Sequence, residues 1–370
     1  MNRILYIDVP FANETGGDKN RSRFLWNALQ NNFDADCLLI GKDLATTRGP
    51  FYQSESVFAF DAEAREQFNR QLAERKYNAV VTRFHSPWEL AKLAQAHPTK
   101  PAVVVDLDMI SSRLVALAWR AKPTMQNRWF LFEKLKLERQ ERQLYRQPWL
   151  IFFSNPVEMA GACSGHVPAA KFALLPNVMP ASPKPCPVIA PKPVVLFFGS
   201  MNSAANLDGF RFLADEILPL LEGDLRKHGV KIRVAGKGAP SWFKERAGDC
   251  VEIVGPVDSM ERAILESQFI LLPLRIASGT RTRILEAAAL GKAIVTTTIG
   301  AEGIEVGDDA LVRDDPAALA AAVRQLLEQP TLAAEMGQRL QARCAARYAS
   351  DKVAADFTSE INRFIAGGAR

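Results

Sequence analysis

Six prolines fall within the fourteen residues Pro180–Pro193 (PASPKPCPVIAPKP), and this segment limits the possible folds more than any other. Proline has no backbone N–H and a fixed φ angle, so the segment cannot lie inside a β-sheet. It predicts a semi-extended linker with a separate domain on each side. The chain has 370 residues, which is enough for two domains that each bury a core.

Short apolar runs rich in β-branched residues alternate with amphipathic segments on both sides of this linker. Continuous apolar runs of this kind are typical of buried parallel strands, and the segments between them have helical spacing. The fold class that we predict is therefore α/β, with two Rossmann-like, doubly wound parallel-sheet domains that face a cleft. The predicted strands are Arg3–Asp8, Cys37–Ile40, Ala79–Thr82, Ala102–Asp106, Leu150–Ser154, Val194–Gly199, Lys231–Ala235, Val251–Val254, Phe269–Pro273 and Ala293–Thr297. The predicted helices include Arg21–Asn31, Trp129–Tyr145, Leu207–Leu221, Arg283–Leu290, Pro316–Leu327, Leu332–Tyr348 and Val353–Ile365.

Charge and hydropathy exclude several classes of protein. A net charge of +5 spread over the chain suits anionic ligands but lacks the concentrated basic face of a nucleic-acid-binding protein. No apolar run approaches the roughly 20 residues of a membrane span, and Met1–Asp8 does not resemble a signal peptide. We expect a cytoplasmic protein, with peripheral contact at the inner face of a membrane as an open alternative, and no nucleic-acid partner.

Cysteine and histidine usage predicts neither disulfides nor a metal site. The five cysteines include no CxxC pair, and the four histidines lie at no metal-ligand spacing. We therefore expect a reduced protein without a bound metal or other cofactor. Its oligomeric state is left open.

The segment Leu271–Thr298 (LLPLRIASGTRTRILEAAALGKAIVTTT) has the composition of an anion-binding loop. A strand ends, a loop with Gly279 follows, and a helix begins whose N-terminal N–H groups can bind an anion. Arg281 and Arg283 can each clamp phosphate oxygens, and Glu286 can accept hydrogen bonds from sugar hydroxyls. An ordinary helix start with solvated arginines is the alternative interpretation. Gly291 is expected to end this helix.

The same segment resembles the donor-binding signature of the GT-B glycosyltransferases, in particular the retaining group 1 (GT4-type) family. That signature carries two glutamates eight residues apart, followed by a small-residue helix, a glycine and a buried strand. Glu286 occupies the second glutamate, whereas Ser278 stands at the first. Gly279-Thr280-Arg281 matches a variant of the family with a GTR motif. Further matching segments are Phe197–Asp208, Val234–Gly238, Val254–Val257, Gly300–Ile304, Asp106–Asp108 and Leu175–Asn177.

This resemblance implies a transferase that moves a sugar from a nucleoside diphosphate donor to a carbohydrate or lipid-linked acceptor, in glycan or polysaccharide biosynthesis. It further implies retention at the anomeric carbon without an essential metal. Arg281 and His85 are the implied catalytic residues. The implied donor-binding residues are Gly17, Gly255, Val257, Ser278, Gly279, Thr280, Arg283 and Glu286, and the implied acceptor-binding residues are Asp18, Lys19, Arg21 and Asp106.

The domain limits follow from the linker and from the resemblance. We predict an N-terminal acceptor-side domain at residues 1–180, the proline-rich linker at 181–193 and a C-terminal donor-binding domain at 194–352. The C-terminal helix at 353–370 is expected to pack back on the first domain, as the resemblance implies. Two crossings of this kind would allow the domains to close over the substrates.

Several alternatives remain open on the residues alone. Gly16-Gly17 could form a plain surface turn, His85 could be a packed residue, and Asp106 and Asp108 could cap the next helix. The basic amphipathic segment Trp129–Tyr145 could lie on an anionic membrane, although a solvated helix on its own domain is the simpler interpretation. At the level of function, the alternatives are a GT-B nucleotide-sugar epimerase and a catalytically inactive donor-binding or scaffold subunit.

Overall fold

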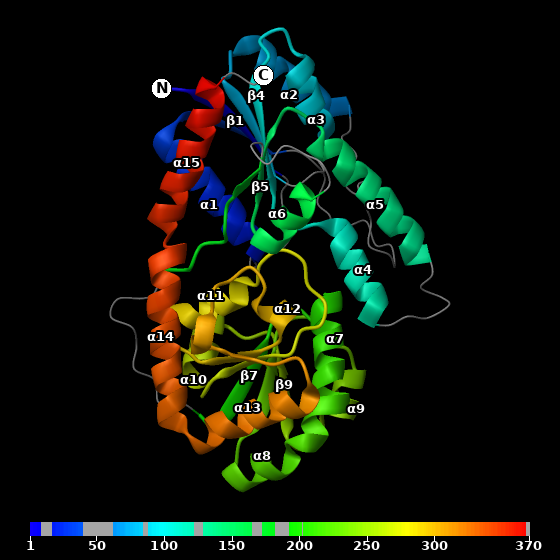
Figure 1. Ribbon diagram of the computed structural model, residues 1–370, viewed down its shortest axis with the longest axis vertical. Coiled ribbons are helices and arrows are strands. Elements are labelled where there is room, and N and C mark those ends of the chain that lie inside the picture. The colour runs from blue at the N-terminus through cyan, green and yellow to red at the C-terminus, as the bar shows by residue number, and fades with distance from the viewer. Residues whose placement is uncertain are drawn as a thin grey trace. The chain divides into compact units, whose positions relative to one another are not determined.

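The computed structural model describes residues 1–8, 17–39, 62–83, 88–121, 129–164, 172–181, 192–201 and 203–367, which form two compact units (Figure 1). Unit 1 comprises Met1–Arg113, Trp129–Val178 and Ser350–Arg370, and unit 2 comprises Leu114–Arg128 and Met179–Ala349. Most of the proline-rich linker predicted at 181–193 lies outside the described residues.

Unit 1 is built on a parallel sheet of six strands in the order β2-β1-β3-β4-β5-β6. The short strand β6 at the sheet edge is not among the predicted strands, because three residues carry too little periodicity to be recognised. The strands are β1 (Arg3–Asp8), β2 (Asp34–Leu39), β3 (Ala79–Arg83), β4 (Ala102–Leu107), β5 (Leu150–Phe153) and β6 (Phe172–Leu174).

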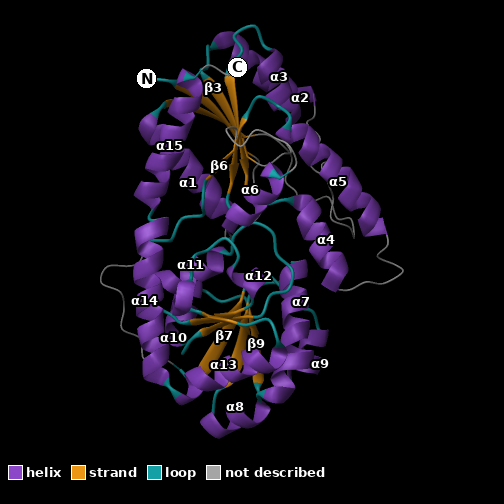
Figure 2. Cartoon of the chain, viewed as in Figure 1, coloured by secondary structure: helices purple, strands orange, loops and turns teal. Residues whose placement is uncertain are grey.

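Helices cover both faces of this sheet (Figure 2). One face packs on α2, α3, α5 and α6 through a core that includes Phe68, Leu90 and Leu144. The other face packs on α1 and α15 through Leu25 and Phe357. The helices of unit 1 are α1 (Gly17–Asn32), α2 (Ala62–Glu74), α3 (Trp88–Ala96), α5 (Trp129–Tyr145), α6 (Pro156–Cys163) and α15 (Ser350–Ala366). Helix α4 (Ser111–Ala121) begins in unit 1 and passes into unit 2 at Leu114.

The C-terminal helix α15 belongs to unit 1, although α14, which directly precedes it, belongs to unit 2. It lies beside α1, and its Phe357 ring meets Phe152 of β5 edge-on with the ring centroids 5.1 Å apart. Val353 and Ile361 are buried on the same face of the helix. Burial of these apolar side chains is what holds the end of the chain on the first unit.

Unit 2 contains a second parallel sheet of six strands, in the order β12-β11-β10-β7-β8-β9. The predicted α/β class with two doubly wound parallel sheets is therefore confirmed. Strand β12 was not predicted, because it has only two residues. The strands are β7 (Val194–Phe198), β8 (Lys231–Ala235), β9 (Val251–Gly255), β10 (Ile270–Leu272), β11 (Ile294–Thr296) and β12 (Leu311–Val312).

The helix predicted over Leu207–Leu221 is not continuous. The α-helix α7 (Ala204–Phe212) passes into a π-helical segment, Leu213–Ile217, and then into a 3₁₀ turn, Leu218–Leu220. Pro219 in that turn cannot donate a backbone hydrogen bond, so an α-helix cannot continue through it. The other helices of unit 2 are α8 (Glu222–His228), α9 (Trp242–Ala247), α10 (Met260–Glu266), α11 (Thr282–Ala289), α12 (Thr298–Ala301), α13 (Pro316–Glu328) and α14 (Pro330–Tyr348).

Candidate functional site

The strand order of unit 2 reverses at β7. From β7 the chain proceeds through β8 and β9 on one side, and it returns through β10, β11 and β12 on the other. In an open parallel sheet, the loops that follow the strands at such a reversal point leave a crevice in which ligands bind. The loops after β7 and β10 are therefore the first place to look for a site.

Glycines bring the loops after β7, β8 and β9 into close contact. The N–H of Gly199 donates to the main-chain oxygen of Ala235, and the N–H of Gly236 donates to that of Gly255 over 2.6 Å. Gly199 and Gly236 have φ angles of +144° and +147°, and a Cβ on Gly236 would overlap the main-chain oxygen of Gly199. Only glycine fits this contact, in which the main chains after β7 and β8 meet directly.

The loop after β10 carries the predicted donor signature. Ser278, Gly279 and Thr280 are buried, and Gly279 has a φ angle of +70°. Arg281 stands at the N-cap of α11 without a side-chain capping hydrogen bond, and its guanidinium donates to the main-chain oxygen of Ser278. The first turn of α11 therefore presents backbone N–H groups and guanidinium charge at the same end of the sheet.

Arg283 connects this helix to the loop after β7. Its Nη1 donates a hydrogen bond of 2.6 Å to the main-chain oxygen of Phe198, and a Cβ on Gly199 would lie 2.7 Å from the same nitrogen. Burial, together with the positive charge of Arg281, lowers the pKa of Arg283 to about 10, against the opposing effect of Glu286. Two guanidinium groups are thus held close together, an arrangement that an anion would stabilise.

Glu286 lies one turn further along α11. Burial raises the pKa of its carboxyl group, while the charge of Arg283 and a hydrogen bond with Thr282 act in the opposite direction. A half-buried carboxylate beside an anion site can accept hydrogen bonds from the hydroxyls of a sugar or ribose.

The other residues of this region have different roles. Arg275, which follows β10 closely, is held by Asp208 in a two-pronged ion pair at 3.0 and 3.1 Å and by Glu216 at 2.9 Å. Gly255 ends β9 with a φ angle of +69°, and the half-buried Val257 packs against the core two residues later.

A separate cluster of charged groups lies at the carboxyl ends of the strands of unit 1. Arg21 of α1 donates from Nε and Nη2 to both carboxylate oxygens of Asp106, over 2.8 and 2.5 Å. Its Nη1 donates to Asn177 over 3.0 Å, and Arg83 and Asp108 lie beside the pair. Burial acts against the charge of Arg21, but Asp106 and Asp108 more than compensate and raise its pKa.

Two of the predicted acceptor-binding residues belong to this cluster. Arg21 is only 2% exposed and Asp106 is fully buried, and here they form a buried ion pair with each other; their contact with an acceptor stays a prediction. Gly17 begins α1, but the side chains of Asp18 and Lys19 and the whole of Gly16 and His85 lie outside the described residues.

Arg83 and Asn177 belong to the cluster, but the sequence analysis assigned them no site role. Arg83 directly follows the predicted strand Ala79–Thr82, and Asn177 completes the Leu-Pro-Asn segment. Among the described residues, no group of three or more His, Cys, Asp or Glu side chains could hold a metal ion. Within the same part of the chain, no helix is long and apolar enough to cross a membrane.

Most of unit 2 matches a known protein family in sequence. Residues 192–329 match the family model "Glycosyl transferases group 1". No curated protein sequence gives a significant match to the chain.

The whole chain is similar in fold to several solved structures. Sucrose-phosphate synthase from Thermosynechococcus elongatus superimposes with a TM-score of 0.74 at 17% identity, over 100% of both chains. HepE from Anabaena, solved in complex with UDP-glucose, gives a TM-score of 0.64 at 13% identity, over 98% of this chain and 100% of HepE. A glycosyltransferase from Rickettsia africae gives 0.66 at 12% identity, over 98% of each chain. The predicted GT-B architecture is confirmed, whereas the GT4 subtype and the GTR motif remain predictions.

Proposed function

We propose that this chain, which has the GT-B fold and matches group 1 glycosyltransferases over residues 192–329, transfers a sugar from a nucleoside diphosphate donor to a carbohydrate or lipid-linked acceptor. The observation that carries the proposal is the placement of Arg281 and Arg283 at the start of α11, against the glycine-lined loop after β7. The role that we propose for this activity is in glycan or polysaccharide biosynthesis.

In this proposal, the diphosphate of the donor binds at the N-terminus of α11. As the bond between the sugar and the diphosphate breaks, negative charge grows on the leaving oxygen. Arg281, Arg283 and the N–H groups of the first turn can stabilise that charge without a metal ion. Glu286 then holds hydroxyls of the ribose, while the backbone after β9, at Gly255 and Val257, meets the base.

Retention of configuration is part of the same proposal. A double displacement requires a carboxylate positioned as nucleophile. Ser278 stands where the related signature has its first acid, and Glu286 lies beside Arg283. We therefore favour a reaction on a single face of the sugar, in which a donor phosphate oxygen takes the proton of the acceptor hydroxyl. His85 and the Gly17–Lys19 segment remain candidates for the sugar and acceptor side of the reaction.

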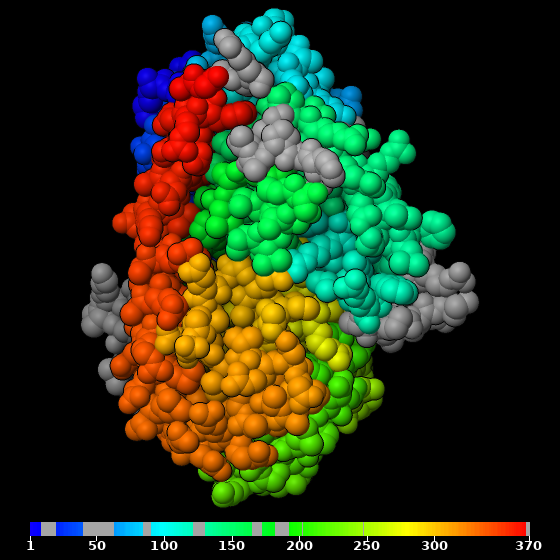
Figure 3. All heavy atoms as spheres, in the orientation of Figure 1, coloured from blue at the N-terminus to red at the C-terminus, as the bar shows by residue number. Residues whose placement is uncertain are grey.

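A lipid-linked acceptor would bring the enzyme to a membrane surface. Helix α5 projects side chains from the surface of unit 1 (Figure 3), with Phe132 76% exposed and Leu135 57% exposed beside Lys136 and Arg139. Exposed apolar and cationic side chains on one helix can bind anionic lipid. If they do, sedimentation with vesicles containing phosphatidylglycerol should decrease in a Phe132→Ser variant.

The activity is tested by incubating the protein with a panel of UDP-, GDP- and TDP-sugars, starting with UDP-glucose because HepE was solved with it. A bound donor should raise the melting temperature by mass action, and a transferase should slowly release nucleoside diphosphate and free sugar. Appearance of an isomerised nucleotide sugar would indicate an epimerase. Saturable binding of a nucleotide sugar without any turnover, even with glycan acceptors, would indicate a scaffold subunit.

A further inference from the structure

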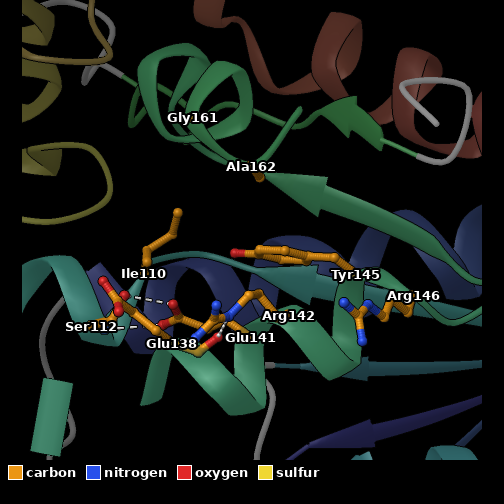
Figure 4. Close-up of a pocket in the computed structure, with 9 residues that line it drawn as sticks. All are labelled: Ile110, Ser112, Glu138, Glu141, Arg142, Tyr145, Arg146, Gly161 and Ala162. Carbon is orange, nitrogen blue, oxygen red and sulfur yellow. Dashed lines mark hydrogen bonds between the residues drawn. The ribbon is translucent and has the colours of Figure 1, made fainter. Parts of the chain in front are cut away.

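Unit 1 contains a cavity of about 400 Å³ that shares no residue with the charged cluster at the ends of its strands. The described residues around it come from the start of α4, from the second half of α5 with Arg146 beyond it, and from the end of α6 (Figure 4). A volume of this size is at the lower end of the range for small-molecule sites. The lining residues are Ile110, Ser112, Glu138, Glu141, Arg142, Tyr145, Arg146, Gly161 and Ala162.

Tyr145 directs its hydroxyl group into this cavity (Figure 4). The side chain is only 7% exposed, and among the described residues its hydroxyl has no hydrogen-bond partner. Phe153 and Phe172 hold the ring in place, with centroids 6.0 and 5.6 Å away. A buried hydroxyl without a partner is unfavourable, so a ligand that bonds to it would be stabilised.

Acidic groups form another wall of the cavity. Glu141 is 6% exposed, and its two carboxylate oxygens accept hydrogen bonds from the N–H and the hydroxyl of Ser112, over 3.0 and 2.5 Å. Each oxygen keeps further capacity as an acceptor. Glu138 lines the same wall and is paired with Lys134 at 2.5 Å. A ligand that reaches this wall must donate hydrogen bonds.

Basic groups lie at the exposed edge of the cavity. Arg142 and Arg146 are both exposed, and Arg142 donates its Nε to the main-chain oxygen of Glu138. Guanidinium groups only donate, so a ligand that reaches this edge must accept hydrogen bonds. Ile110, Ala162 and the ring of Tyr145 supply the apolar contacts.

These walls select against charged ligands. An anion would face Glu138 and Glu141, and a cation would face Arg142 and Arg146. A hydroxyl group can donate to a carboxylate and accept from a guanidinium or a phenol, so a ligand with several hydroxyls satisfies every wall at once. We propose that the cavity between α4, α5 and α6 is a binding site for a neutral polyhydroxylated ring, that is, for a sugar unit. This site is outside the donor site, and its existence does not depend on the proposed transferase activity.

The test uses the full-length protein with ring-labelled tyrosine and NMR. The chain has five tyrosines, so the Tyr145 resonance is identified by its loss in a Tyr145→Phe variant. Glucose, galactose and N-acetylglucosamine are titrated separately, without nucleotide. At least one of them should shift the Tyr145 resonance, and saturation-transfer NMR should show affinity about three- to tenfold lower in Tyr145→Phe.

A second variant covers the case in which Tyr145→Phe does not fold. Apart from its chain neighbours and the backbone of its own helix, no atom lies within 4 Å of the position that a Cβ on Gly161 would take, so a Gly161→Leu side chain has room to grow at this lining position. It should abolish the sugar-induced shift. Tyr77→Phe is the matched control, because this hydroxyl of unit 1 bonds to Asp36 and not to the cavity, and it should leave the shift unchanged. The inference is overturned if no sugar shifts Tyr145, if the shift survives in Gly161→Leu, or if acetate or methylammonium shifts Tyr145 more than the sugars do.

Discussion

Arg283 donates a hydrogen bond of 2.6 Å from Nη1 to the main-chain oxygen of Phe198, the last residue of β7. The two residues are 85 positions apart in the sequence. The bond ties the first turn of α11 to the loop at which the strand order of unit 2 reverses. It therefore places a half-buried guanidinium where the diphosphate of a donor is expected to bind.

Replacement of Arg283 by Met keeps most of the volume of the side chain and removes its charge. We expect the dissociation constant for UDP to rise at least tenfold, because a charge-assisted hydrogen bond to phosphate contributes about 1.5–3 kcal/mol. Calorimetric titration measures it. Arg226→Met, which removes an exposed arginine paired with Glu222 on α8, is the control and should bind UDP normally. Equal affinities in the two variants would place the diphosphate elsewhere.

The contact between Gly236 and Gly199 should not tolerate any side chain. Gly236→Ala adds a Cβ that overlaps the main-chain oxygen of Gly199, at a φ angle that alanine rarely adopts. We expect a loss of about 2–3 kcal/mol or more in the free energy of unfolding, measured by urea denaturation. Gly223→Ala in α8 has no neighbouring atom within 4 Å of its new Cβ and should be neutral or slightly stabilising. A stable Gly236→Ala protein would show that the loops can separate.

Donor binding should depend on the ionisation of Glu286. Because burial raises the pKa of this carboxyl group, its protonation begins closer to neutral pH than that of an exposed glutamate. Protonation removes an acceptor for ribose hydroxyls, so the affinity for UDP should decrease as the pH falls from 7.5 towards 5. Glu286→Gln should bind UDP more weakly by about 1–3 kcal/mol and with less dependence on pH. The same pH profile in both proteins would remove Glu286 from the site.

The free energy of unfolding should decrease more when one member of the buried pair Arg21–Asp106 is replaced than when both are replaced. Arg21→Met leaves the Asp106 carboxylate buried without its main partner, which should reduce the free energy of unfolding by about 3–5 kcal/mol. Arg21→Met combined with Asp106→Leu should recover much of that loss, because an apolar pair needs no compensation. Urea denaturation of the single and double variants measures the difference. A double variant no more stable than the single one would contradict the structural role.

Glu141 lies at the wall of the cavity in unit 1 and should make the protein more stable as the pH falls. A carboxyl group whose pKa is lowered by folding has the opposite effect. Burial, together with Glu138 and Glu158, raises its pKa from 4.5 to about 6, against the two hydrogen bonds from Ser112. The folded state then binds more protons than the unfolded state between about pH 4.5 and 6. The resulting penalty is present in full above pH 6 and disappears as the pH falls to 4.5.

Relative to a Glu141→Gln variant, the wild-type protein should therefore gain about 2 kcal/mol in unfolding free energy between pH 7 and 4.5. Urea denaturation at several pH values measures the difference. Glu74→Gln, at an exposed position of α2, is the control and should show no such change relative to wild type. A difference between wild type and Glu141→Gln that does not vary with pH would contradict the raised pKa.

The sequence by itself determined the features that depend on neighbouring residues. The buried strand predicted over Ala102–Asp106 is a continuous run rich in β-branched residues. The helix predicted over Arg283–Leu290 ends before Gly291, which has a φ angle of +66°. These signals are local, because the periodicity of strands and helices and the conformational freedom of glycine act within a few residues. The α/β class and the position of the donor loop follow from them.

Only the tertiary structure decided which charged groups meet. Arg21 is a possible acceptor ligand by sequence, yet it is paired with Asp106, 85 residues away. Arg275 is likewise paired with Asp208, 67 residues away. Arg283 differs from them because it donates to a main-chain oxygen, which is uncharged. That hydrogen bond positions the guanidinium without neutralising its charge. The sequence around an arginine is the same whether the arginine forms a structural ion pair or binds a ligand. What separates the roles is the partner that the folded chain brings within about 3 Å, and no local pattern encodes that distance.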